Sequence, residues 1–168
     1  VTLTGGGRLE LLDGLIETGS HTLTNANHTI AGSGRLGVNS IFAVNAVNTG
    51  TIIAEGHRLL LNGYFTGNGV YRMAENATLE FTRPAFATGV YASGGRVEFT
   101  SPGVEKLRVN DYSGFDLSLA GFGLGDRFLF GFLTPVQSAS WNAGVLTAEF
   151  SNEVRQFNLE GDYSKVTF

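Results

Sequence analysis

The chain contains no cysteine, which excludes disulfide scaffolds, cysteine-ligated zinc sites and thiol nucleophiles. Charged residues are also scarce, at 15% of 168 residues. The formal charge of −4 argues against a nucleic-acid partner, because such binding needs basic residues that neutralise phosphate. No apolar run reaches the roughly 18 residues of a membrane-spanning helix, so we expect no membrane insertion by this segment. The start at Val1, without a signal-peptide pattern, indicates a mature chain or an excised piece.

Amphipathic helix patterns are nearly absent, since the 24 glycines interrupt almost every candidate segment. Short alternating runs of apolar and polar residues recur instead, for example over 58–61, 78–81 and 96–99, with Gly, Asn and Ser clusters between such runs. Hydrophobic residues make up 42% of the chain, enough for a packed interior. These features predict an all-β protein, built as a sandwich, a barrel or a solenoid.

An internal repeat favours the solenoid. Its unit is a small residue, a turn residue, an Arg or Thr, and two apolar residues in alternation, recurring at intervals of 18 to 27 residues. The first apolar residues of the units are Leu9, Leu36, Leu59, Leu79 and Val97. One coil cannot bury its apolar side alone, so several coils must stack, with strands about 4.8 Å apart. We expect these five residues to lie above one another in a single interior column.

Charged residues flank the apolar positions of the repeat, namely Arg8, Glu10, Glu80, Arg96 and Glu98. Stacked coils would set them in a ladder on one exposed face. Such a ladder is either a solvated face with weak ion pairs or a track for an anionic glycan. The mixture of acid and base favours the solvated face.

The C-terminal third differs, because the repeat fades and eight of the 13 Phe lie between 115 and 168. The segments 136–141, 145–150 and 154–159 are typical of consecutive antiparallel strands joined by turns. Large apolar residues at a solenoid end indicate a cap over exposed strand edges or, alternatively, a surface for assembly. We expect β-solenoid rungs over residues 1–110 and an aromatic-rich antiparallel β cap over residues 111–168.

Several segments carry a resemblance to a known class. Residues 28–34 (HTIAGSG) and 48–56 (NTGTIIAEG) resemble the passenger-type β-helix repeats of large secreted Gram-negative proteins, the autotransporters and filamentous-haemagglutinin-like adhesins. Segments after residue 115, such as 144–147 (GVLT), are similar to a module near the C-terminal ends of such repeat regions. The resemblance implies a right-handed parallel β-helix, a secreted or cell-surface bacterial protein, and a role in adhesion, matrix or display.

Motifs for catalysis or metal binding are missing. The sequence has no nucleophile elbow, P-loop or dinucleotide fingerprint, and its three histidines (His21, His28 and His57) belong to no paired-His motif. Residues 121–126 (GFGLGD) faintly resemble a calcium-binding glycine-aspartate repeat, but in one copy only. The acids that recur with the repeat are Glu55, Glu75, Glu80 and Glu98. Their regularity suits a repeated solvent position better than a unique catalytic pair, so we expect no catalytic, metal or cofactor-binding residue.

Aromatic residues near the expected corners are the remaining binding lead: Tyr64, Phe65, Tyr71, Tyr91 and Tyr112. They either stack on sugars or pack adjacent rungs together, and packing is favoured. The sequence therefore predicts a non-enzymatic structural or adhesive module, with a surface glycan or a protein receptor as possible partner. The alternatives are a self-assembling filament or matrix subunit, associating through the solenoid ends, and a polysaccharide-binding or polysaccharide-degrading β-helix protein.

Overall fold

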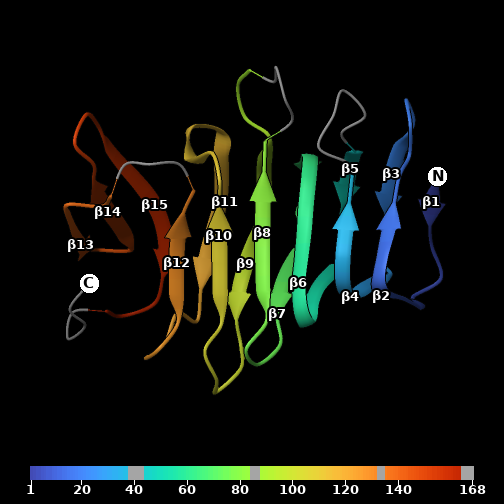
Figure 1. The fold of residues 1–168 in the computed structure, drawn as a ribbon, viewed down its shortest axis with the longest axis horizontal. Coiled ribbons are helices and arrows are strands. Elements are labelled where there is room, and N and C mark those ends of the chain that lie inside the picture. The colour runs from blue at the N-terminus through green and yellow to red at the C-terminus, as the bar shows by residue number, and fades with distance from the viewer. Residues whose placement is uncertain (38–43, 84–87, 132–134, 164–168) are drawn as a thin grey trace.

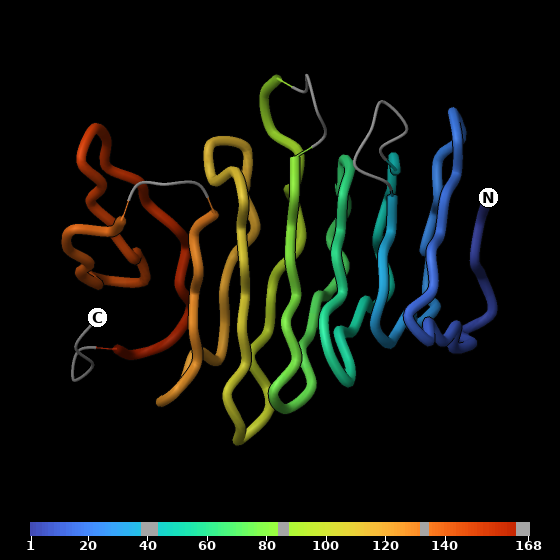
Figure 2. Tube along the Cα trace, viewed as in Figure 1, coloured from blue at the N-terminus to red at the C-terminus, as the bar shows by residue number. Residues whose placement is uncertain are grey.

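A computed structural model of the chain describes residues 1–37, 44–83, 88–131 and 135–163. The all-β prediction is confirmed, because 61% of the described residues are in strands and none is in an α-helix. The chain winds through about five turns of a parallel β-solenoid. Successive turns lie side by side along the long axis, from β1 at one end to β13–β15 at the other (Figure 1, Figure 2).

Each turn contributes strands to three faces, numbered here in chain order. Face 1 consists of β1 (Thr2–Leu3), β3 (Thr22–Asn25), β5 (Val44–Asn48), the end of β6 (Thr51–Thr66) and the starts of β9 (Ala92–Phe99) and β11 (Phe115–Ala120). Face 2 consists of the first parts of β2 (Arg8–Ile16), β4 (Thr29–Leu36) and β6, then β7 (Val70–Met73), the later parts of β9 and β11, and the end of β15 (Val154–Glu160). Face 3 consists of the last parts of β2 and β4, the middle of β6, then β8 (Thr78–Thr82), β10 (Lys106–Val109) and β12 (Arg127–Phe130). The pairings between successive turns are parallel, so equivalent residues stack from turn to turn.

The interior columns differ from the single column that the repeat predicts. Leu59 and Leu79 are register partners on face 3, as predicted. Leu36 also lies on face 3, but it pairs with Leu61, two residues after Leu59. Leu9 and Val97 lie on face 2 instead. The prediction of one column was wrong because each turn carries two similar apolar-x-apolar strands, one on face 2 and one on face 3. An alignment of the repeat by residue type therefore matches face 2 strands of some turns with face 3 strands of others.

An interior asparagine pair marks the corner between faces 1 and 2. Asn25 and Asn48 are in register and almost fully buried, and Asn25 Nδ2 donates to Asn48 Oδ1 at 2.9 Å. Asn25 Oδ1 accepts from the backbone N–H of His28 at 3.0 Å, which satisfies a donor where the strand bends. The buried amide of Asn25 thus pairs with a backbone N–H that the bend would otherwise leave without a partner.

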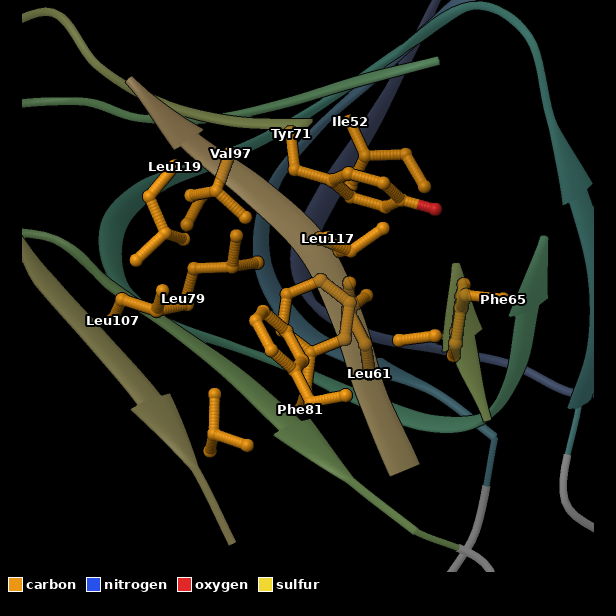
Figure 3. Close-up of a cluster of buried hydrophobic side chains, with 14 of the residues drawn as sticks. Ile52, Leu61, Phe65, Tyr71, Leu79, Phe81, Val97, Leu107, Leu117 and Leu119 are labelled. Atoms are coloured by element: carbon orange, nitrogen blue, oxygen red, sulfur yellow. The ribbon is translucent and has the colours of Figure 1, made fainter. Parts of the chain in front are cut away.

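The core is one continuous apolar cluster that fills the space between the three faces. Phe81 lies at its centre, and its ring makes edge contacts with Phe65, Tyr71 and Phe115 at centroid distances of 6.1, 5.3 and 5.3 Å. Figure 3 shows Phe81 pointing into the interior among leucines from the neighbouring turns. Stacked turns therefore share their apolar side chains, and the burial of each depends on its neighbours.

The C-terminal end is closed by the predicted antiparallel strands. β13 (Ser138–Asn142) pairs with β14 (Val145–Glu149), and β14 pairs with β15. The end of β15 then joins β11 in parallel, which attaches this sheet to the last turn of face 2. Solenoid pairing runs past the predicted boundary at residue 110. A short 3₁₀ helix (Tyr112–Gly114) follows β10, and β11 and β12 then add a further turn.

Candidate functional site

The carboxylates that recur with the repeat are held by local ion pairs on different faces. On face 2, Glu98 pairs with Arg72, whose Nε lies 2.6 Å from Glu98 Oε2, and with Arg96 on its own strand. Burial alone would raise the pKa of Glu98. The hydrogen bonds and charges of the two guanidinium groups outweigh burial, so its pKa lies below the usual value. Glu98 is therefore an ionised structural partner rather than a proton donor.

Glu80 lies on face 3, away from Glu98, and only 3% of it is exposed. Arg58 Nε approaches Glu80 Oε2 at 2.7 Å, and Asn110 Nδ2 donates to Glu80 Oε1 at 2.5 Å. Both oxygens are thus engaged by residues of neighbouring turns. The structure does not bring Glu80 and Glu98 together as a pair that could act on one glycosidic bond.

The other two repeat-linked acids lie between faces 2 and 3. Glu55 forms an ion pair with Arg8, which is two turns away, at 2.5 Å. Glu75 is exposed in the turn after β7. The charge ladder predicted for one face therefore exists only in part: Arg8 and Glu10 pair on face 2, as Arg96 and Glu98 do, whereas Glu80 belongs to face 3.

A buried acid that the sequence reasoning did not single out lies where β9 connects to β10. Glu105 is fully buried, and its Oε1 accepts from the backbone N–H of Ser101 at 3.1 Å. Burial raises the pKa of Glu105 to about 7, against the lowering effect of backbone hydrogen bonds. Its side chain is thus neutral over the acidic range, which suits a carboxyl enclosed within a turn.

Asp126, the aspartate of the segment that resembles a calcium repeat, has a structural role. Its Oδ1 accepts from the backbone N–H of Glu105 at 3.0 Å, and its Oδ2 accepts from that of Gly123 at 2.7 Å. It therefore joins two successive turns at one corner. Within the described ranges, no group of three or more His, Asp or Glu residues is placed to hold a metal ion.

The corner aromatics lie mainly inside the solenoid. Phe65, Tyr71 and Tyr91 are fully buried, and only Tyr64 and Tyr112 are half-buried. The Tyr91 hydroxyl donates to the backbone oxygen of a residue on the next turn, Asp111, at 2.7 Å. Of the two alternatives, the structure thus favours packing between rungs over sugar stacking for the three buried rings.

Face 3 carries a strip of basic side chains that the sequence reasoning missed. Its strands contain Arg35, Arg58, Lys106, Arg108 and Arg127, and its acids are Glu80 and, at the bend where β2 enters the face, Asp13. Four of the five cations are exposed, and Lys106 is half-buried. Two depressions of about 270 and 320 Å³ lie along this face, and Arg58 lines both. We call these five cations and the two depressions the basic strip.

An apolar cleft of about 480 Å³ separates the last turn of face 3 from the C-terminal sheet. Phe128 and Phe130 of β12 lie on one side, and Leu146 and Ala148 of β14 lie on the other. Its rim includes the charged residues Asp126 and Arg127. With apolar walls and few polar groups, the cleft can bury an apolar side chain.

In the part of the chain that the structure describes, no helix has the length and apolar character needed to cross a bilayer. Comparison with known protein families, with curated proteins and with solved structures finds no match for this chain.

Proposed function

We propose that this chain is a non-catalytic structural and adhesive module of a secreted or surface-attached bacterial protein. The distribution of its acids carries the proposal. Glu80 and Glu98 are each engaged by cations of neighbouring turns, on separate faces, and do not line a common groove. A glycan-degrading β-helix needs converging carboxylates, whereas a scaffold needs acids only where they stabilise the stack.

The architecture supports such a role in physical terms. Strands inside the stack hydrogen-bond to a turn on either side, as β4 does with β2 and β6. Stability is then spread over the turns, which suits a stiff element that presents long parallel faces to a partner. The repeat segments' resemblance to passenger-type β-helices supports a location outside the cell.

The experiment that tests the proposal asks whether the chain shortens any polysaccharide. The purified chain is incubated with dextran, polygalacturonate and heparin, and product size is measured by size-exclusion chromatography. We expect the length of each polymer to stay unchanged, because no carboxylate pair is placed to cleave it. In parallel, beads coated with the chain should adhere to a cell layer more than uncoated beads.

Single-residue variants make the outcome decisive. Glu55→Gln, Glu75→Gln, Glu80→Gln and Glu98→Gln should not weaken bead adherence, once each variant is shown to be folded. Shortening of a polysaccharide that one of these substitutions abolishes would replace the proposal with a glycan-degrading enzyme.

A further inference from the structure

The described cations fall into two groups that differ in their partners. On face 2, at the corners and on β15, the arginines form ion pairs with Glu or Asp: Arg8, Arg72, Arg83, Arg96 and Arg155. On face 3 only Arg58 does so, with Glu80. Arg35, Lys106, Arg108 and Arg127 form no ion pair with any residue that the structure describes. Among the described Arg and Lys side chains, those without an ion pair thus lie on one face of a chain whose formal charge is −4.

The register places these cations close to one another. Lys106 and Arg127 are direct partners on β10 and β12, and Arg108 follows Lys106 by two residues on the same side of β10. Neighbouring parallel strands lie about 4.8 Å apart, and residues two positions apart on a strand are about 6.6 Å apart. Like charges opposite one another on a sheet destabilise it. An anion bound across the face would remove this repulsion between the neighbouring cations.

The strip continues along the solenoid axis. Arg58 aligns with Lys106 through Thr78 of the intervening strand, and Arg35 aligns with Arg108 through Leu60 and Glu80. The two depressions connect these positions, since one includes Arg35 and Arg58 and the other Arg58, Lys106 and Arg108. The positive charge therefore crosses successive turns from β4 to β12, as a chain-like ligand requires.

The other side chains of the strip indicate which polyanion it suits. The outward positions between the cations carry Thr78 and Thr82, which offer hydroxyl groups, Leu60 and Leu129, and Asn110, whose Nδ2 donates to Glu80 and Thr82. None of these positions is aromatic, although single-stranded nucleic acids are held largely by base stacking on aromatic rings. Hydroxyl groups suit the hydroxyls of a sugar chain, and the cations suit its acidic groups.

We propose that the basic strip binds a polysaccharide bearing carboxylate or sulfate groups, lying along the solenoid axis across β4 to β12. This inference rests on the proposed function, whose adhesive ligand it specifies. The bound chain neutralises Arg35, Lys106, Arg108 and Arg127, which form no ion pair with a described residue. Because the contacts are charge-assisted at an exposed surface, binding weakens as salt is added.

The test measures binding of the whole chain to four immobilised polymers at 50 and 300 mM NaCl. Heparin carries sulfate and carboxylate, polygalacturonate carries carboxylate only, dextran is neutral, and poly(dT) is a single-stranded nucleic acid. The test variant is Arg108→Gln/Arg127→Gln. The control is Arg8→Gln/Arg155→Gln, which removes the same charge from ion-paired arginines outside face 3, of which Arg8 is exposed and Arg155 half-buried. Thermal unfolding verifies that both variants are folded.

We expect salt-sensitive binding to heparin, to polygalacturonate or to both, and none to dextran. Binding to heparin alone assigns sulfate as the anion, and binding to polygalacturonate shows that carboxylate suffices. The test variant loses two of the five cations of the strip, so it should bind about tenfold or more weakly. The control should stay within about twofold of the parent chain.

Three results would overturn the inference: no binding to either acidic polysaccharide, equal weakening in test and control variants, or binding to dextran or poly(dT) as tight as to the acidic glycans. Tight binding to poly(dT) would identify a nucleic-acid surface instead. The inference can fail without the proposed function, because loss of glycan binding leaves a non-catalytic module. Shortening of a polysaccharide, or coated beads that adhere no better than uncoated ones, contradicts that function.

Discussion

Replacing Phe81 by alanine should lower the free energy of unfolding by about 3–5 kcal/mol, the range for removing a large aromatic side chain from a packed core. Phe81 is fully buried on β8, and its ring contacts Phe65, Tyr71 and Phe115. Phe65 and Phe115 lie on face 1, two turns apart, and Tyr71 lies on face 2, so one truncation opens a cavity shared by several rungs. Guanidinium unfolding followed by tryptophan fluorescence and circular dichroism measures the loss.

A matched surface truncation tests whether the loss depends on burial. Leu124 is fully exposed in the turn before β12, so Leu124→Ala should change stability by no more than about 0.5 kcal/mol. Similar losses for Phe81→Ala and Leu124→Ala would mean that Phe81 is not at the centre of the core.

The second large effect is expected at Gly32, where β4 bends from face 2 to face 3. Gly32 has φ +127°, and a Cβ atom there would lie 2.0 Å from the backbone oxygen of Leu11 on the preceding turn. Gly32→Ala therefore combines an unfavourable backbone conformation, about 1–3 kcal/mol, with a clash of about 1–3 kcal/mol against backbone that cannot move aside. We expect a loss of about 3 kcal/mol or more in the same unfolding experiment.

Gly56 supplies the comparison for Gly32, because it lies at the equivalent bend of the next turn. It also has a positive φ, +76°, but a Cβ atom there would meet no heavy atom within 4 Å. Gly56→Ala should therefore cost only the backbone term, about 1–2 kcal/mol. If Gly56→Ala were as destabilising as Gly32→Ala, close contact between turns would not be the cause.

The fold class could be predicted from the sequence because short alternating strands, abundant turn residues and a repeat all indicate stacked coils. The strands of the C-terminal sheet could be located as well, because turns of Gly, Asn and Ser separate them clearly. The register could not be predicted. Leu9 and Leu59 look alike in sequence but lie on faces 2 and 3, and only the lengths of the intervening bends distinguish them.

The basic strip could not be predicted for a related reason. Arg35 and Arg58 are part of the visible repeat, but Lys106, Arg108 and Arg127 lie where the repeat fades. Their proximity depends on loops of unequal length that return each strand to face 3. Cations outnumber acids at the strand positions of face 3. This excess can be recognised only when the register shows which residues belong to that face. The inward position of Phe65, Tyr71 and Tyr91 depends on the same register.

The measurement that tests the solenoid register most directly is disulfide formation between designed cysteine pairs, because the chain has no cysteine of its own. Thr78 and Lys106 are direct partners on β8 and β10, whereas Arg108 is displaced by two residues. Their Cα atoms are expected about 4.8 and 8 Å apart, and a disulfide requires roughly 4.4–6.8 Å. Mild oxidation should therefore cross-link Thr78→Cys/Lys106→Cys within one chain and leave Thr78→Cys/Arg108→Cys reduced, as mass spectrometry would show. Cross-linking of only the displaced pair, or of neither pair, would contradict the stacked arrangement of turns.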